Sequence, residues 1–253
     1  MGEPDTGAQW EANAPAWIEM SRAGADRYRD LVNTPAFLDA LPDVTGLHCL
    51  DVGCGEGHNT RLLVERGARM TALDISDAFL RAARDADPSS RYIRGDGSSL
   101  PFAGATFDAA TAFMSIMDVA DPAVAIGEIA RVLRPGGWLQ FSITHPVNTT
   151  PVRRWIDEDG VRTWLAIGDY FVEGPMTDSW TFKAACEMRM RHEPFTITAA
   201  RRTVSSWMNM VIDAGLTIEH VVEPVASESI ARRHPEVADT RIVPFFLIVR
   251  ARR

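Results

Sequence analysis

The chain has 253 residues, of which 46% are hydrophobic and 24% are charged, and its formal net charge is −8. This composition is that of a globular protein with ample residues for a core. The negative charge argues against a nucleic acid as partner, because Lys and Arg supply most nucleic-acid affinity. No apolar run approaches the ~20 residues of a membrane-spanning helix, and the acidic N-terminus does not resemble a signal peptide. We therefore expect a cytoplasmic protein that does not contact a membrane.

The chain contains no internal repeat and no low-complexity linker, so we expect residues 1–253 to form a single domain. Residues 1–44 are predicted to be helical. From residue 45 onwards strands alternate with helices, which predicts an α/β protein with a parallel sheet and right-handed crossovers. The predicted strands are 47–52, 69–74, 91–96, 107–114 and the segment from Trp138 to His145, and the predicted helices follow Gly57, Ser76 and Asp121.

The alternation of strands and helices lapses over residues 147–198. A connection this long inside a compact domain is usually functional, so we expect a substrate cap inserted over the carboxyl edge of the sheet. Residues 199–253 are predicted to complete the sheet, with a helix over 199–214 and strands over 216–222 and 243–251.

The segment LDVGCGEG, residues 50–57, joins a predicted strand directly to a helix and places three glycines in the turn. Glycines there let the backbone approach a ligand closely, beside the positive end of a helix dipole. A dinucleotide site would place its third glycine at position 58, where this chain has His58, and the Lys of a P-loop is absent. The pattern therefore favours a ligand without phosphates, although a plain tight turn also fits these glycines.

Acidic residues end two further predicted strands. Asp74 ends the second, where a carboxylate can accept hydrogen bonds from both hydroxyls of a ribose. Asp96 ends the third, within reach of an adenine amino group at the same sheet edge. Each acid alone also fits a helix cap or a solvated loop. Together with Asp51 and Gly53 they place polar groups at three strand ends in order, which favours a ligand that contains ribose and adenine.

Five segments together resemble the class I S-adenosylmethionine-dependent methyltransferases, specifically the ubiquinone-methyltransferase-like group that acts on small molecules. They are LDVGCGEG, ALDIS, GDGSSLPF, FDAATAFMSIMDV and EIARVLRPGGWL, which span roughly residues 45–145. The resemblance implies a Rossmann-like, seven-stranded, mostly parallel sheet with helices on both faces and an antiparallel last strand. It also implies a helical lid over 1–44, a cofactor-binding core over 45–146, a substrate cap over 147–198 and a C-terminal completion over 199–253.

The resemblance further implies which residues hold S-adenosylmethionine. Asp74 would bind the ribose, and Ile75 would pack on the adenine. Asp96 would take the adenine amino group, with Gly97 beside it. The methionine portion would lie in the glycine loop, against Asp51, Gly53, Cys54 and Gly55.

Three aromatic residues complete the cofactor site that the resemblance implies. Phe113 would lie along the cofactor backbone. Trp17 and Tyr28, in the helices that resemble the lid of this family, would close the pocket. Ordinary core packing is the alternative for both lid residues.

The stretch FSITHPV places His145 at the carboxyl end of a strand, because Pro146 has no N–H for the ladder and stops it. Open α/β sheets bind their ligands at this edge. Methyl transfer to a hydroxyl requires alignment and deprotonation of the acceptor, and a histidine suits the second task. We predict His145 as the general base, oriented by Asp118, with His192 as the alternative base. A purely structural cap is the alternative role for His145.

The substrate cap carries aromatic residues beside charged ones, a combination that suits a sugar ring. The FSITHPV ending and this cap also resemble the sugar 1-O-methyltransferases of methylmannose polysaccharide biosynthesis. The sequence therefore favours methylation of a hydroxyl on a small acceptor, a saccharide in particular. Ordinary packing at the domain edge is the alternative for the tryptophans. The predicted acceptor-binding residues are Trp155, Trp164, Tyr170, Trp180 and His192.

Other activities remain open: methylation of a carboxylate, carbon or nitrogen of another small metabolite, or cofactor binding without turnover. The predicted cofactor is S-adenosylmethionine, with S-adenosylhomocysteine as product and a small molecule as the acceptor. No ligand spacing demands a metal, although a divalent ion held through water by Asp118 and His145 would be compatible. Cys49, Cys54 and Cys186 are expected to be reduced. The oligomeric state stays open, a homodimer included.

Overall fold

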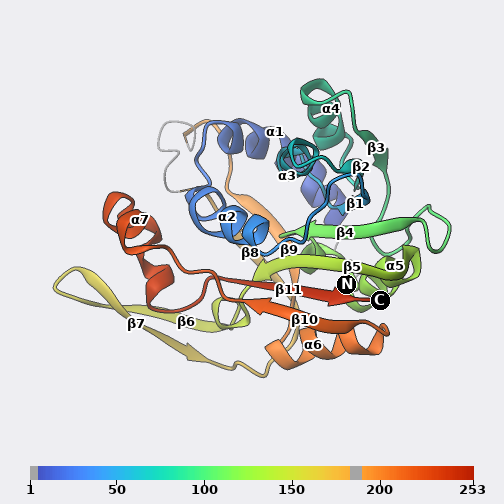
Figure 1. Cartoon of the computed structure of the whole chain (residues 1–253). Helices are drawn as coiled ribbons and strands as arrows, with labels where there is room; N and C mark the ends of the chain where they lie inside the picture. Colours follow the sequence, from blue (N-terminus) through green and yellow to red (C-terminus); the bar gives the residue numbers. More distant parts are fainter. Residues whose placement is uncertain (1–4, 183–189) are drawn as a thin grey trace.

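A seven-stranded sheet forms the centre of the computed structural model, which describes residues 5–182 and 190–253 (Figure 1). Its strands are β1 (His48–Val52), β2 (Arg69–Asp74), β3 (Arg91–Arg94), β4 (Phe107–Phe113), β5 (Leu133–Thr144), β10 (Thr217–Val222) and β11 (Phe246–Arg252). Their spatial order is β10-β11-β5-β4-β1-β2-β3. β11 runs antiparallel to both its neighbours, whereas the pairs from β5 to β3 are parallel. The predicted α/β fold with an antiparallel last strand is confirmed.

Helices cover both faces of this sheet (Figure 1). One face packs against α5 (Pro122–Val132) and α6 (Val204–Asp213). The other packs against α2 (Thr34–Asp39), α3 (His58–Glu65) and α4 (Asp77–Ala86). Both faces are therefore apolar, which explains why the central strands show nearly continuous hydrophobic runs.

The helices begin at the capping residues that the sequence indicates. The Ser76 hydroxyl accepts a hydrogen bond from the Phe79 N–H at 3.2 Å at the start of α4. Asp121 accepts one from the Ala123 N–H at 3.0 Å, and Pro122 takes the first helical position of α5. These bonds satisfy backbone donors that a helix leaves free at its first turn, so the chain turns from strand to helix at fixed points.

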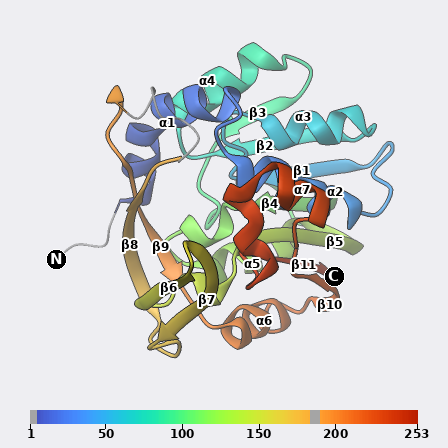
Figure 2. The ribbon, with the colours of Figure 1, turned by 90° about the vertical axis from the view of Figure 1, so that its left-hand side faces the viewer.

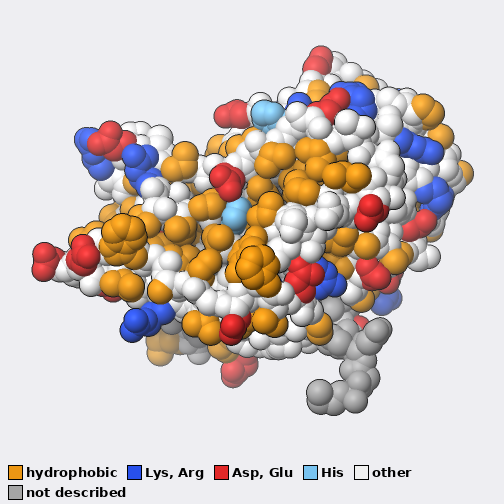
Figure 3. Space-filling model, turned by 90° about the horizontal axis from the view of Figure 1, so that it is seen from below, with side chains coloured by type: hydrophobic (Ala, Val, Ile, Leu, Met, Phe, Trp, Pro, Cys, Tyr) orange, Lys and Arg blue, Asp and Glu red, His pale blue; other side chains and the backbone are white. Residues whose placement is uncertain are grey.

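The residues after β5 fold into two antiparallel hairpins, which the sequence analysis did not anticipate. The first pairs β6 (Val152–Glu158) with β7 (Val161–Gly168), and the second pairs β8 (Gly174–Trp180) with β9 (Phe195–Arg201). The β6–β7 hairpin projects from the body and exposes hydrophobic side chains (Figures 1 and 3). A short helix, α7 (Glu228–Arg233), and a 3-10 segment, Pro235–Arg241, lie between β10 and β11.

Two predicted boundaries are wrong in this region. The helix predicted from residue 199 begins at Val204, because residues 199–201 still belong to β9 and Thr203 caps the helix by accepting the Ser206 N–H. The last strand begins at Phe246 and not at residue 243. Periodicity alone did not separate the end of β9 from the helix that follows.

The N-terminal residues are helical, as predicted. α1 (Thr6–Arg22) leads through a π-helical turn, Arg29–Asn33, into α2. α1 packs against α4 and alongside β9 (Figure 2). It therefore bridges the core of the sheet and the second inserted hairpin.

Within the described part of the chain, no helix is both long enough and apolar enough to cross a membrane. Cys49 and Cys54 are free and buried thiols. Cys186, which the sequence analysis grouped with them, lies outside the described residues.

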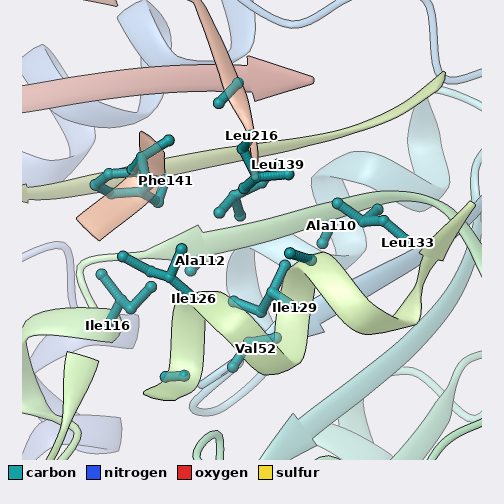
Figure 4. Close-up of a cluster of buried hydrophobic side chains, with 14 of the residues drawn as sticks. Val52, Ala110, Ala112, Ile116, Ile126, Ile129, Leu133, Leu139, Phe141 and Leu216 are labelled. Atoms are coloured by element: carbon teal, nitrogen blue, oxygen red, sulfur yellow. The ribbon is translucent and has the colours of Figure 1, made fainter. Parts of the chain in front are cut away.

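The core between α5 and the sheet gives a test of the fold. Ile126 is fully buried and points at strand residues such as Ala112 (Figure 4). Ile126→Ala should lower the free energy of unfolding by about 2–4 kcal/mol, because it deletes buried methyl groups and leaves a cavity. Val124, on the same helix, is 47% exposed, and Val124→Ala should change stability by less than about 0.5 kcal/mol. Urea unfolding measures both; equal losses would contradict this placement of α5.

Candidate active site

The glycine loop between β1 and α3 has a backbone that favours glycine. Gly53, Gly55 and Gly57 have φ of 71°, 55° and 80°, values that side-chain-bearing residues rarely adopt. The Gly53 N–H donates to the Leu73 carbonyl of β2 at 2.7 Å. A Cβ atom at Gly53 would lie 2.3 Å from the Ser115 Cβ. The loop is therefore packed closely against the turn that follows β4.

Asp51 lies beneath this loop and is 1% exposed. Its Oδ2 accepts a hydrogen bond from the Thr60 hydroxyl at 2.6 Å, and its Oδ1 accepts one from Thr111 at 3.1 Å. Burial raises the pKa of Asp51 to about 6. The two hydrogen bonds lower this pKa, but burial has the larger effect. Burial likewise raises the pKa of the Cys54 thiol, so this cysteine is a neutral part of the loop. Asp51 therefore ties α3 and β4 to the loop.

Asp74 joins the end of β2 to the glycine loop. Its Oδ2 accepts the Gly55 N–H at 2.8 Å, and its Oδ1 accepts the Ser76 N–H at 2.9 Å. Burial raises the pKa of Asp74 to about 6, and the backbone hydrogen bonds oppose this rise. A carboxylate oxygen has two lone pairs, so each oxygen can accept one more bond. Asp74 thus has the spare acceptors that two ribose hydroxyls require.

The residues predicted to contact the adenine follow the ends of β2 and β3. Ile75 is half-buried, and α1 packs so closely on it that a Cβ at Gly7 would lie 2.8 Å from its Cδ1. Asp96 is exposed, and its Oδ1 accepts the Ser98 N–H at 2.8 Å. Gly97 is buried beside Val52 of β1. These residues follow strand ends at the same sheet edge as Asp74, and Ile75 lies next to α1.

The two lid residues lie in different surroundings. Trp17 of α1 packs on Phe195 of β9, with ring centroids 5.3 Å apart. The Tyr28 hydroxyl donates to the Asp239 carboxylate at 2.7 Å, and its ring packs on Phe245 at 4.6 Å. Burial and the Asp239 charge raise the pKa of Tyr28 above its ordinary value, so it is a neutral donor. Trp17 therefore fastens α1 to the second hairpin, and Tyr28 fastens the N-terminal segment to Pro235–Arg241.

Phe113 is the last residue of β4, and its ring stacks on Phe37 of α2 at 3.6 Å. Met114 follows with a φ of 51°, a left-handed conformation that turns the chain towards Ser115. The Ser115 hydroxyl then donates to the Val52 carbonyl at 2.5 Å. Phe113 is thus mainly packed against α2, and the turn after β4 closes on the glycine loop.

His145 is 5% exposed at the end of β5, but its partner is not the predicted Asp118. The His145 Nε2 lies 2.9 Å from the Glu223 carboxylate, which follows β10, and the Nδ1 accepts the Val147 N–H at 3.3 Å. Burial lowers the pKa of His145, and the Glu223 charge acts in the opposite direction. The sequence analysis missed Glu223, because no local pattern links residues 78 positions apart.

Asp118 is 8% exposed and ends the 3-10 turn Ile116–Asp118 that follows β4. Within the described residues its side chain makes no hydrogen bond or ion pair. Burial raises the pKa of Asp118 to about 8, so it is largely neutral at pH 7. The turn packs against β9. Asp118 is therefore a protonated, buried carboxyl between the sheet edge and the second hairpin.

The predicted acceptor-binding residues do not converge on one surface. Trp155 pairs with Leu165 and Trp164 pairs with Ile156, so the two tryptophans lie on opposite faces of the β6–β7 hairpin. Trp164 is 64% exposed, whereas Trp155 covers the Arg162 guanidinium at 4.9 Å. The other three residues make contacts elsewhere: Tyr170 with the Val204 N–H, Trp180 with Phe195, and His192 with Glu19 of α1.

In the described ranges, no group of three or more His, Cys, Asp or Glu side chains is arranged to hold a metal ion. The groups that do converge are Asp51, Gly53, Gly55 and Asp74, at the carboxyl ends of β1 and β2. A glycine turn and a strand-end acid at this edge of a mostly parallel sheet define an α/β protein that binds a nucleoside-containing cofactor.

Comparison with known proteins identifies the family. A family model described as a methyltransferase domain matches residues 50–141. The demethylmenaquinone methyltransferase of Renibacterium salmoninarum is 34% identical over 180 residues, and the match covers 58% of this chain and 74% of that protein. The malonyl-[acyl-carrier protein] O-methyltransferase of Pectobacterium atrosepticum is 35% identical over 119 residues, which are 46% of this chain and 47% of that protein.

A solved structure extends the likeness over most of the chain. The S-adenosylmethionine-dependent methyltransferase from Mesorhizobium loti superposes with a TM-score of 0.73 and 34% identity, over 87% of this chain and 96% of that one. The chain belongs to the S-adenosylmethionine-dependent methyltransferases. It spans about half the length of the malonyl-[acyl-carrier protein] relative.

Gly53 offers a test of the cofactor loop. Gly53→Ala should weaken S-adenosylhomocysteine binding at least about tenfold. The new methyl group would lie 2.3 Å from the Ser115 Cβ, so the loop or Ser115 must move. Gly46→Ala is the matched control, since Gly46 has a φ of 75° and nothing within 4 Å of the added methyl. The control should lose about 1–2 kcal/mol of stability and keep its affinity. Calorimetry measures both affinities, and an equal fall in the two variants would contradict a role of the Gly53 loop in cofactor binding.

Asp118 predicts a pH dependence of stability. Its pKa rises from 3.8 in a free carboxyl to about 8 in the fold, so between these values the native state holds a proton that the unfolded chain has lost. Stability should therefore fall as pH rises through this window, by up to ~1.4 kcal/mol per unit. Asp118→Asn should remove this slope. Urea unfolding from about pH 5 to 8 measures the free energy of unfolding of both proteins. If it changed with pH in the same way in both, Asp118 would be ionised in the fold and the prediction would be wrong.

Proposed function

We propose that this protein transfers a methyl group from S-adenosylmethionine to an oxygen atom of a small hydroxylated acceptor. The observation that carries the proposal is the Asp74 carboxylate, which is held against the glycine loop by two backbone N–H groups and keeps two lone pairs free. Membership of the methyltransferase family supports the same activity.

The residues present fit this cofactor. Gly53 and Gly55 allow the backbone to approach the methionine portion, and Asp74 has free acceptors for the ribose hydroxyls. Ile75 offers an apolar side chain to the adenine, and the exposed Asp96 carboxylate offers its amino group an acceptor beside Gly97. The bound cofactor supplies a methyl group on a positively charged sulfur, so the protein needs only to align and activate the acceptor.

We propose His145 as the general base for a hydroxyl acceptor. Its burial lowers its pKa, so the ring is neutral and can accept a proton at pH 7. When Nε2–H donates to Glu223 at 2.9 Å, Nδ1 is the unprotonated nitrogen and carries the lone pair that can accept a proton. The competing Val147 N–H is 3.3 Å from Nδ1, a long and weak bond. In this arrangement Glu223 fixes the tautomer, which is the role that the sequence assigned to Asp118.

A saccharide is the acceptor class that we propose to test first. The inserted hairpins bring tryptophans beside charged groups, as in the contact of Trp155 with Arg162 at 4.9 Å. Trp155 and Trp164 lie on opposite faces of the β6–β7 hairpin, so only one of the two rings would stack on a sugar. Trp155→Ala would then be the variant that raises the acceptor KM.

Carboxylate methylation is the second candidate. The malonyl-[acyl-carrier protein] O-methyltransferase of Pectobacterium atrosepticum is among the relatives. A carboxylate needs no base, and the protonated Asp118 is a hydrogen-bond donor near the same sheet edge, which suits an anionic oxygen. His145 would then have no role in turnover, which separates the two candidates.

A methyl-transfer screen with radiolabelled S-adenosylmethionine against sugars, phenols and carboxylic acids tests the function. With a hydroxyl acceptor, His145→Ala should keep cofactor affinity and lose about 10²–10⁴ in kcat, the usual contribution of a general base. The rising limb of kcat/KM in the wild type should lie below about pH 6.5, since burial lowers the His145 pKa.

The control for this screen is His220→Ala, because His220 is exposed on β10. This variant should behave as the wild type does. Full activity of His145→Ala on a carboxylic acid would select the second candidate. Cofactor binding without labelled product from any acceptor would indicate a protein that binds the cofactor without turnover.

A further inference from the structure

Arg201, the last residue of β9, has a guanidinium without a protein partner. Its Nε and Nη1 atoms are enclosed by protein, yet neither donates a hydrogen bond. Across residues 5–182 and 190–253, Arg201 also forms no ion pair. Enclosing a cation without a partner is costly, so such a group usually serves a ligand or a reaction. The sequence analysis did not select Arg201.

The strand that carries Arg201 packs against the turn that follows β4. Side chains alternate along β9, so Arg201 shares a face with Phe195 and Ile197, which are 1% and 3% exposed. This inward face belongs to a strand that packs against the turn Ile116–Asp118. The same turn contacts the glycine loop through Ser115. Arg201 therefore belongs to a strand that packs against the turn between β4 and α5, and this turn contacts the end of β1.

Two acids on neighbouring elements make other contacts or are neutral. Arg201 pairs with Gly174 in the hairpin, and the arginine charge that acts on the adjoining Glu173 is that of Arg202. The Glu173 carboxylate, however, accepts the Thr203 N–H at 2.8 Å and the Ser206 hydroxyl at 2.6 Å, and so caps α6. Burial raises the pKa of Asp118, in the turn that packs against β9, to about 8. Neither carboxyl group pairs with Arg201 among the described residues, so its guanidinium is available to an anion.

We propose that Arg201 binds an anionic group of the methyl acceptor, a carboxylate or a phosphate. The proposal rests on the proposed function and narrows it to acidic acceptors, such as a uronic acid, a sugar phosphate or a small carboxylic acid. Guanidinium groups bind such oxyanions through short, charge-assisted hydrogen bonds. The third nitrogen, Nη2, is not among the enclosed atoms, so an anion reaches the guanidinium there.

Calorimetry on the complex with S-adenosylhomocysteine tests this subsite with four probes: glucuronate, glucose 6-phosphate, malonate and glucose. At least one anionic probe should bind, and glucose should not. Arg201→Gln should weaken that binding at least about tenfold, the effect of losing a charge-assisted hydrogen bond. Arg202→Gln is the matched control, because among the described residues the Arg202 guanidinium makes one hydrogen bond, from Nη1 to the Arg201 carbonyl at 2.8 Å, and its charge acts on Glu173. Arg202→Gln should bind the probe as the wild type does.

Thermal unfolding without ligand gives an independent readout. Arg201→Met should raise Tm, because it removes enclosed donors that have no partner, whereas Arg202→Met should not. A lower Tm for Arg201→Met would show a structural role and overturn the proposal. So would equal binding of glucose and glucuronate, or no binding of any anion. S-adenosylhomocysteine affinity is measured in the same samples. Normal affinity without anion binding would contradict the anion subsite alone, whereas loss of S-adenosylhomocysteine binding would contradict the proposed function.

Discussion

The fold depends on one buried carboxylate at the junction of two strands. Asp74 accepts hydrogen bonds from Gly55 in the glycine loop and from Ser76 at the start of α4, so a single side chain fixes both backbone turns at the sheet edge. Its burial is costly, as its pKa of about 6 shows, and the two N–H bonds offset that cost. A ligand that adds two donors to this carboxylate improves its solvation. The same interaction therefore organises the loop and prepares it for the cofactor.

α1 connects this cofactor loop with the inserted hairpins. Its Glu11 carboxylate accepts bonds from the Ser76 hydroxyl at 2.6 Å and the Ala78 N–H at 3.2 Å, at the start of α4. On its other side, Gln9 exchanges hydrogen bonds with Thr198 of β9, with its amide oxygen accepting the Thr198 N–H at 2.8 Å. Displacement of α1 would break contacts at both sites. α1 thus links the start of α4, beside the glycine loop, to β9, the strand that carries Arg201.

Electrostatics distinguishes the cofactor side from the acceptor side. On the cofactor side, buried carboxylates are solvated by backbone and hydroxyl donors, as with Asp51 and Thr60 at 2.6 Å. On the proposed acceptor side, Asp118 and two enclosed nitrogens of Arg201 have no such partners among the described residues, and His145 depends on the half-exposed Glu223. Unsatisfied polar groups lower stability, and a fold keeps them where a ligand completes them.

The sequence by itself determined the cofactor half of this protein. Strand and helix periodicity, the glycine turn and the acid of β2 are local signals, and the residues that make contact lie next to each other along the strand ends. Only the tertiary structure decided the acceptor half. The bond of His145 to Glu223, the separation of Trp155 from Trp164 and the unpartnered Arg201 nitrogens arise where hairpins and strands distant in sequence meet. Such contacts follow from packing between elements, and no periodicity within one element encodes them.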